Sequence, residues 1–335
     1  MLKIYKILAV IVFTSILSYG ASIGKVSGAT EHEIPTWFKQ SFLDITEDVA
    51  EASKNNKHLM LFIDLDGCPY CTKMLNESFF AKNQTSDFIK KHFDVINLNV
   101  KGDREVTWDQ NTTLSEKDLA IRLGIEYSPT VLFLDENKKV ILRLNGYRSA
   151  QNFKLILEYV NGKHYLNMNL ASFLAGVKNK TLYTPIQNKS FQKIKDLSKI
   201  NTPLALIIED GSCTQCEYFH KTTLKNKDVI DEFSKFAIVR FDANSDEEFI
   251  GTDGIKTTPK QFVKKMDLDY RPGIFLYDEG KLVSTIDALL YSFHFKELLR
   301  YVSHKEYNNY SGFLAYLSVR QSQLTAAGIN IDLSK

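Results

Sequence analysis

The chain has four cysteines, and all of them lie in two Cys-X-X-Cys pairs, Cys68-Pro-Tyr-Cys71 and Cys213-Thr-Gln-Cys216. Two thiols at this spacing can form a structural disulfide, hold part of a metal site, or act as a catalytic thiol pair. A disulfide that closes so small a loop restricts the unfolded chain little, because loop-closure entropy grows with loop length. The spacing therefore disfavours a structural disulfide.

The two cysteine pairs belong to an internal repeat. Tyr127-Ser-Pro129 follows the first pair, and Tyr270-Arg-Pro272 follows the second at a similar distance. A later segment, Phe153-Lys-Leu-Ile-Leu-Glu-Tyr-Val160, matches Phe295-Lys-Glu-Leu-Leu-Arg-Tyr-Val302. Because these matches keep their order and nearly their spacing, they indicate a tandem duplication.

Each repeat predicts strands that alternate with helices, then a hairpin and a final helix. Short apolar runs bounded by polar residues predict strands over 57–63, 93–100, 130–134 and 140–144, and over 204–208, 236–241, 274–277 and 282–286. Helical spacing is found over 72–80, 119–123, 153–160 and 295–302, and helical lead-ins are expected over 36–54 and 190–198. This order predicts a mixed α/β sheet in each repeat.

A strand that ends in Cys-X-X-Cys at the start of a helix, with a later proline before a hairpin, resembles the thioredoxin fold. Both repeats resemble thioredoxin-related domains, most closely the exported SoxW type, and residues 57–160 carry the clearer match. The resemblance implies an α/β chain of tandem thioredoxin-like folds, each a mixed β-sheet flanked by helices.

The chemistry of disulfide exchange gives each cysteine a role. A thiolate is the attacking species, and a helix N-terminus favours the thiolate. Cys68 would lie at that end, with Pro69 where a missing N–H costs nothing. Cys71, one turn later, would attack the mixed disulfide formed by Cys68. Cys213 and Cys216 are predicted to act in the same way.

The resemblance also implies a substrate-binding loop beside the cysteines. Pro129 is expected to be a cis proline, with Ser128 and Thr130 next to it in the peptide-binding segment. Arg271 and Pro272 take this place in the second repeat. Arg271 is expected to face the sulfurs, where a cation would either stabilise a thiolate or hinder substrate entry.

Three further expectations concern the surroundings of the cysteines. Where thioredoxins have a buried acid six residues before the first cysteine, this chain has Phe62 and Ile207. The nearby acids Asp64, Asp66, Glu209 and Asp210 are candidates to substitute in part. His220 is expected to be a solvated helix residue. Polar insertions over 101–117 and 244–260 should lie at the cysteine end of the sheets, where Trp108 would shield or read the substrate, or be plain surface elaboration.

The N-terminus predicts export. Residues 1–22 combine a short basic start with an apolar run over 7–17, as in a secretory signal peptide; an uncleaved anchor is the alternative. The remaining chain divides into a first domain (31–162), a linker (163–189), a second domain (190–303) and a C-terminal tail (304–335). No later segment is apolar enough to span a membrane once the signal is cleaved.

Composition narrows the class of function. A hydrophobic fraction of 44% with 24% charged residues is typical of globular domains. The formal net charge is only +2, and no basic stripe with interleaved aromatic residues supports nucleic-acid binding.

The sequence thus predicts an exported thiol-disulfide oxidoreductase, in the bacterial periplasm, that acts on disulfide-containing proteins without a cofactor or a metal. The resemblance adds a membrane thiol carrier of the DsbD or CcdA type as electron donor. Two alternatives stay open. The cysteine pairs could handle zinc or copper, or one or both repeats could bind polypeptide without turnover.

Overall fold

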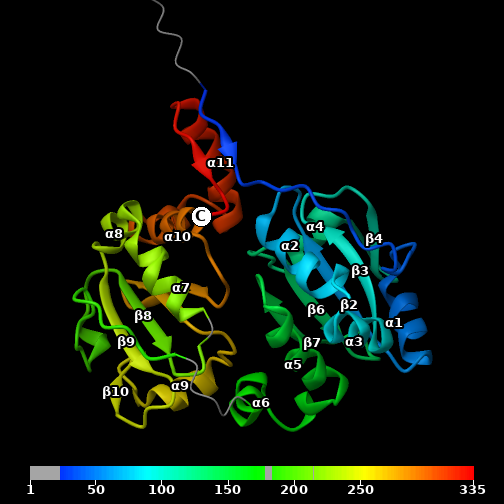
Figure 1. Cartoon of the computed structure of the whole chain (residues 1–335), viewed down its shortest axis with the longest axis horizontal. Helices are drawn as coiled ribbons and strands as arrows, with labels where there is room; N and C mark the ends of the chain where they lie inside the picture. Colours follow the sequence, from blue (N-terminus) through cyan, green and yellow to red (C-terminus); the bar gives the residue numbers. More distant parts are fainter. Residues whose placement is uncertain (1–22, 178–182, 214) are drawn as a thin grey trace, which may run out of the picture.

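Two similar α/β domains form the body of the molecule (Figure 1). This computed structural model describes residues 23–177, 183–213 and 215–335, so the expected signal peptide lies outside the described residues. Each domain has a mixed four-stranded sheet flanked by helices, which confirms the predicted fold class. Within the described residues, none of the helices has the length and apolar character needed to cross a membrane.

The sheet of the first domain has the strand order β3-β2-β6-β7. Strand β2 (His58–Asp64) is parallel to β3 (Phe93–Asn99) and antiparallel to β6 (Thr130–Leu134), which pairs with β7 (Val140–Asn145). Every residue of β2 is buried, because helices cover both faces of the sheet. The helices are α1 (Ile45–Lys54), α2 (Pro69–Met74), α3 (Gln84–His92), α4 (Glu116–Arg122) and α5 (Ala150–Asn161), and a π-helical turn (Leu75–Phe80) continues α2.

Alternation along β2 divides the first domain into two cores. Met60 and Phe62 point to the core that contains both cysteines and the apolar face of α5, whereas Leu61 and Ile63 point to the core beneath α1 and α4. The cysteine motif that follows β2 therefore lies at the edge of the core to which Met60 and Phe62 belong.

The second domain repeats this sheet in the order β13-β12-β8-β9. Its strands are β8 (Leu204–Glu209), β9 (Ala237–Asp242), β12 (Gly273–Asp278) and β13 (Lys281–Ile286). Its helices are α7 (Cys216–Lys221), α8 (Lys227–Phe233), α9 (Pro259–Lys265) and α10 (Ser292–Ser303). Strands β8 and β9 are parallel and the other pairs are antiparallel, as in the first domain.

The predicted helical lead-ins are wrong in part. Helix α1 begins only at Ile45, because the Asp44 carboxylate accepts hydrogen bonds from the N–H groups of Thr46 and Glu47 and so caps the helix there. In the second domain no α-helix forms over 190–198; only a 3-10 turn (Leu197–Lys199) ends this segment. The Gln192 N–H donates to the Ile238 carbonyl in β9 at 2.7 Å, so the segment covers part of this edge strand.

The region predicted as a linker contains a helix that touches both domains. Leu170 and Leu174 of α6 (Leu170–Val177) are buried in the core of the first domain. At the start of α6, the Ala171 N–H donates to the Asp267 carboxylate of the second domain, at 3.3 Å. A short 3-10 turn (His164–Leu166) precedes this helix.

The C-terminal tail packs as a helix and a short strand. Phe313 and Leu317 of α11 (Phe313–Ala326) join the core of the second domain. Strand β14 (Ile331–Asp332) pairs with β1 (Val26–Ser27) from the other end of the chain, as Figure 1 shows beside α11. The segment after β1 then crosses to the first domain.

Both polar insertions form small hairpins. They are β4 (Glu105–Asp109) with β5 (Thr112–Ser115), and β10 (Phe249–Ile250) with β11 (Lys256–Thr257). The Trp108 carbonyl accepts a hydrogen bond from Lys138, which lies in the turn between β6 and β7. This turn is at the end of β6 opposite Pro129, so the structure does not place Trp108 at the cysteines, and the surface-elaboration alternative describes it better.

Candidate active site

The first cysteine pair lies at the start of α2. Cys68 is the N-cap residue, and its sulfur accepts the Cys71 N–H at 3.1 Å. Pro69 takes the first helical position, where its missing N–H leaves no bond unmade. The two cysteines form a disulfide with a Cα–Cα distance of 5.3 Å. Cys68 is 6% exposed and Cys71 is fully buried, so Cys68 is the sulfur that an incoming group reaches first.

The second cysteine pair is also a disulfide, with a Cα–Cα distance of 5.6 Å. The Cys216 N–H donates to the Cys213 sulfur at 2.9 Å. Helix α7 begins at Cys216, whereas α2 begins directly after Cys68. The second motif lacks the proline that starts α2, which explains why its helix begins later.

A segment from the end of the predicted linker covers the second disulfide. The Tyr183 N–H donates to the Gly211 carbonyl at 3.0 Å, and the Tyr183 hydroxyl accepts the Ile186 N–H at 2.9 Å. The Tyr183 side chain forms a small buried cluster with Cys213 and Cys216. Nothing in the sequence pattern of this segment signals that role.

The proline loops lie beside the cysteines in both domains. The Ser128–Pro129 and Arg271–Pro272 peptide bonds are both cis, as the resemblance implies for Pro129. The Ser128 hydroxyl lies 3.0 Å from the Cys71 sulfur and 3.5 Å from the Cys68 sulfur. Ser128 is therefore the residue of this loop that the structure brings to the disulfide.

Two other groups of the first proline loop are already occupied. The Pro129 carbonyl accepts the Gly146 N–H at 2.7 Å. Thr130 is completely buried in β6, and its hydroxyl donates to the Tyr127 carbonyl at 2.8 Å. The Thr130 side chain is therefore not presented to a substrate.

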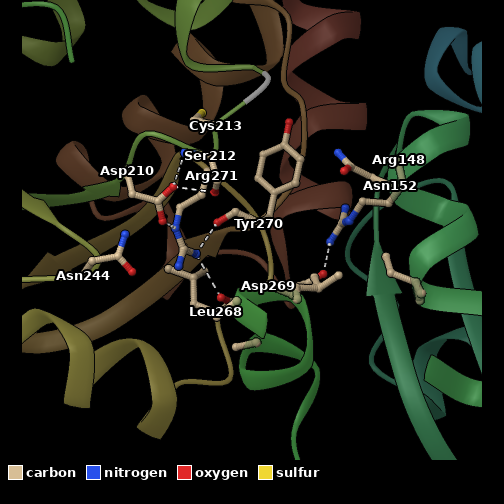
Figure 2. Close-up of a pocket in the computed structure, with 14 residues that line it drawn as sticks. Arg148, Asn152, Asp210, Ser212, Cys213, Asn244, Leu268, Asp269, Tyr270 and Arg271 are labelled. Carbon is tan, nitrogen blue, oxygen red and sulfur yellow. Dashed lines mark hydrogen bonds and ion pairs between the residues drawn. The ribbon is translucent and has the colours of Figure 1, made fainter. Parts of the chain in front are cut away.

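Arg271 does not face the sulfurs as a free cation. Its Nε donates to the Asp210 carboxylate at 2.9 Å, and its Nη1 donates to the carbonyls of Leu268 and Tyr270 (Figure 2). Burial opposes ionisation of Asp210, but the charge of Arg271 and hydrogen bonds from Ser212 outweigh it and lower the pKa of this carboxyl. The expected action of Arg271 on a thiolate is thus replaced by an ion pair.

A pocket of about 100 Å³ lies between the domains, and Cys213 lines it (Figure 2). On the side of the first domain, Arg148 forms an ion pair with Asp269 at 3.2 Å and lies over the Tyr270 ring at 4.8 Å. The side chain of Arg148 is only 2% exposed. This pocket gives Cys213 an opening on the side that Tyr183 does not cover.

The second domain also touches the first cysteine motif. The Tyr70 ring, between the two cysteines, stacks on Tyr291 with 4.8 Å between ring centroids. The Tyr70 hydroxyl accepts the Tyr291 N–H at 2.8 Å and lies 3.0 Å from Nδ1 of His294. Burial lowers the pKa of His294 to about 4, so at neutral pH its uncharged ring can accept the Tyr70 hydroxyl proton.

The expectation that His220 is solvated is wrong. Its side chain is 1% exposed, and its Nε2 lies 2.9 Å from the Glu209 carboxylate. His220 follows Cys216 by one helical turn, so it lies on the same inward face of α7. In the first domain His32 pairs with Asp64 at the same distance.

Within the described residues, no group of three or more histidine, cysteine or acidic side chains is placed to hold a metal ion. The cysteine sulfurs are instead paired in disulfides inside each domain.

A family model described as a thioredoxin-like domain matches the chain twice, over residues 45–161 and 191–303. A thioredoxin-fold protein from Helicobacter pylori is similar at 24% identity, covering 41% of this chain and 91% of that chain, with a TM-score of 0.32. No curated protein matches the chain.

Two further solved structures are similar. For a thioredoxin from Thermus thermophilus the identity is 22%, with 35% of this chain and 83% of that chain covered and a TM-score of 0.28. For a putative disulphide-isomerase from Bacteroides thetaiotaomicron the identity is 19%, with 44% and 96% covered and a TM-score of 0.28.

The two family matches together span more than half of the chain, and each contains one four-stranded sheet and one Cys-X-X-Cys disulfide. The chain therefore belongs to the thioredoxin-like domain family, of which it carries two tandem copies.

Proposed function

We propose that this chain is an exported thiol-disulfide oxidoreductase that reduces or exchanges disulfides in protein substrates. The observation that carries the proposal is the geometry of the first motif. Its disulfide lies at the start of α2, and the Ser128 hydroxyl of the cis-proline loop lies 3.0 Å from the Cys71 sulfur.

The reaction follows from the order of the two cysteines. In the reduced protein, the Cys68 thiolate attacks a substrate disulfide, forms a mixed disulfide and releases one substrate thiolate, which takes up a proton. The Cys71 thiol loses its proton and attacks the Cys68 sulfur, which breaks the mixed disulfide and releases the second substrate thiol. The protein dithiol is thereby oxidised by two electrons, and the substrate disulfide is reduced.

The setting of this reaction is also a proposal. A secretory leader over residues 1–22 and the resemblance of Gly67-Cys-Pro-Tyr-Cys71 to SoxW-type proteins support the periplasm and the reducing direction. A membrane thiol carrier of the DsbD or CcdA type would then return two electrons to the disulfide. Periplasmic fractionation of the tagged full-length protein would test the location.

Insulin reduction by the full chain tests the activity, with Cys68→Ser and Cys213→Ser as separate variants. We expect Cys68→Ser to abolish most of the turnover. Cys68 caps α2 and is the first sulfur of this motif that a substrate reaches. Activity that survives in both single variants and in the double variant would refute the proposal. Cys71→Ser leaves the mixed disulfide unresolved, so it should trap substrates covalently for identification.

The second domain has a specific alternative role as a polypeptide-binding module. Tyr183 covers its disulfide, and Arg271 is held by Asp210 instead of facing the sulfurs. The second domain binds without turnover if two results are found together. Cys213→Ser leaves insulin reduction unchanged, and substitution of Arg271 in the proline loop of this domain weakens peptide binding. A large loss of turnover in Cys213→Ser alone would show that both motifs react.

A further inference from the structure

The pocket between the domains gives the second disulfide a small opening (Figure 2). Cys213 lines it together with residues of both domains, and its volume is about 100 Å³. A single water molecule needs roughly 10–15 Å³ of such space, so the pocket has room for a group of several heavy atoms. On its other side the disulfide is covered by Tyr183, which packs against Cys213 and Cys216. A small molecule therefore fits this opening better than a polypeptide chain does.

Two ion pairs line the pocket. Arg148 of the first domain pairs with Asp269 at 3.2 Å, and Arg271 of the second pairs with Asp210 at 2.9 Å. Each pair presents a cation beside an anion. An amino-acid headgroup carries the complementary arrangement, since its carboxylate and its ammonium group are attached to one carbon. Because guanidinium groups bind carboxylates with good geometry, the charges of this lining match such a headgroup.

Arg148 has a donor that the protein does not use. Its Nη1 donates to the carbonyls of Asn145 and Tyr147, and its Nη2 donates to Asp269. Its Nε is buried and has no hydrogen-bond partner among the described residues. The buried hydroxyl of Tyr270, which also lines the pocket, is without a partner in the same part of the chain. Leaving buried polar groups unpaired costs free energy, so a ligand that bonds to them recovers that cost.

The internal repeat shows that contact between the domains does not require an arginine at this position. Arg148 lies five residues before Phe153, and the matching position before Phe295 is Leu290. Leu290 packs against the core that contains Cys68, so an apolar side chain makes the corresponding contact at the first motif. A buried guanidinium group carries a desolvation cost that an apolar residue avoids. The charge at Arg148 is therefore better explained by recognition of a ligand than by docking of the domains.

We propose that this pocket binds the amino-acid headgroup of a small disulfide, such as cystine, and that the second motif reduces it. The headgroup carboxylate accepts from Arg148, its ammonium group donates to Asp269, and the sulfur of the same half-molecule meets Cys213. The other half of the disulfide extends out of the pocket. The proposal rests on the dithiol chemistry of the proposed function, and it gives the second motif a substrate class of its own.

The reaction starts from the reduced second motif. The Cys213 thiolate attacks one sulfur of cystine, the cystine disulfide breaks, and one cysteine leaves as a thiolate that takes a proton from water. The Cys216 thiol loses its proton to water and attacks the Cys213 sulfur, which releases the second cysteine. The protein dithiol loses two electrons and cystine gains them. A dithiol donor of the class proposed above then reduces the Cys213–Cys216 disulfide again.

The test uses the full chain with Cys68→Ser and Cys71→Ser, so that only the second motif reacts. The reduced protein is mixed with a disulfide, samples are stopped with acid, and the remaining thiols are alkylated and counted by mass spectrometry. Three matched disulfides are compared: cystine, its dimethyl ester, which lacks the carboxylate charge, and diacetylcystine, which lacks the ammonium charge. Each rate constant is divided by that of the same disulfide with dithiothreitol, which removes differences in intrinsic reactivity.

We expect the relative rate for cystine to exceed those for both derivatives at least about tenfold, the effect of one hydrogen bond to a charged group. Arg148→Leu, which introduces the residue found at the matching position of the other repeat, should remove most of this preference. A looser domain contact in this variant raises all three rates together, so the ratio of rates isolates recognition. Arg122→Leu is the matched control, because it removes an exposed arginine at the end of α4. Its ratio should stay within about twofold of the parent.

Equal relative rates for the three disulfides in the parent, or a cystine preference that survives in Arg148→Leu, would overturn the proposal. If Arg148→Leu does not fold, the double variant with Asp269→Leu, which leaves neither charge of the ion pair, decides by the same ratio. Insulin reduction is measured separately on a chain that keeps only the first motif. Failure there with the cystine preference intact refutes only the protein substrates of the proposed function, and loss of the preference with normal insulin reduction refutes only this site.

Discussion

The Tyr70 hydroxyl is expected to hold the second domain closed over the first cysteine motif. It accepts the Tyr291 N–H at 2.8 Å and lies 3.0 Å from Nδ1 of His294. Burial raises the pKa of Tyr70 well above its ordinary value, so the hydroxyl keeps its proton and can donate it to His294. Tyr70→Phe removes both bonds and keeps the ring that stacks on Tyr291.

The size of the effect follows from the groups left behind. An N–H that loses its only partner in a buried contact costs about 1–3 kcal/mol. Since about 1.4 kcal/mol is a tenfold change in an equilibrium constant, the open form of the domain contact should become roughly 5–150 times more populated in Tyr70→Phe. The native fold of each domain should be unaffected, because the substitution removes no apolar ring from either core.

The assay compares two reductants on the Cys68–Cys71 disulfide of the full chain that carries Cys213→Ser and Cys216→Ser. Cys68 is 6% exposed in the closed form, so a bulky protein dithiol needs the open form more than a small dithiol does. In Tyr70→Phe we expect at least a fivefold faster reaction with the protein dithiol and a smaller change with the small one. Amide exchange of Tyr291 should accelerate by a similar factor.

Tyr218→Phe is the matched control. The Tyr218 ring meets the same Tyr291 ring edge-on, and its hydroxyl makes no hydrogen bond to the described residues. This variant should react like the parent protein. If Tyr70→Phe also reacts like the parent, with unchanged exchange at Tyr291 and unchanged thermal stability, the hydroxyl does not hold the domains together.

Two further predictions concern the second motif and the domain contact. Tyr183→Ala should uncover the Cys213–Cys216 disulfide and accelerate its reduction several-fold in a Cys68→Ser, Cys71→Ser chain, whereas Tyr183→Phe, which keeps the covering ring, should change it little; equal rates in both variants would contradict a covering role. Burial raises the pKa of Asp287 to about 6 from 3.8. The native state therefore binds this proton more tightly than the unfolded chain does, and it loses stability as the pH rises from about 4 to about 6. Asp287→Asn should therefore gain stability at pH 7 to 8, up to an upper limit of about 3 kcal/mol that the partial exposure of the side chain reduces, and gain nothing at pH 4; a gain in melting temperature that is the same at both pH values would contradict this.

The strands and the cysteine helices could be predicted from the sequence because they depend on local pattern. Short apolar runs gave β2 and β8 nearly to the residue, and the pair of prolines located both loops. The lead-in over 190–198 was wrongly predicted as a helix, because its helical spacing was outweighed by pairing with the edge strand β9. Tertiary contact decided that segment, and no local signal records it.

The parts of the site that the sequence did not predict are pairings between residues far apart. The sequence marks Arg271 and Asp210 as candidate site residues, but only the folded chain shows that they form an ion pair at 2.9 Å. His220 is expected in solvent, although its spacing of four residues from the buried Cys216 places it on the inward face of α7. The partner of His220 is Glu209, the last residue of β8, whose side chain is buried. Local sequence marks such groups but not their pairing.

The internal repeat does not reveal the contact between the domains that controls access to the first disulfide. Tyr70 belongs to one repeat and Tyr291 to the other, so an alignment of the repeats never compares them. The Arg148–Asp269 pair beside Cys213 spans the same boundary. Both contacts join the same two bodies, so a separation of the domains that frees Tyr70 also opens the pocket that Cys213 lines. One movement would then expose both disulfides together, and a variant that weakens either contact should increase the reactivity of both cysteine pairs.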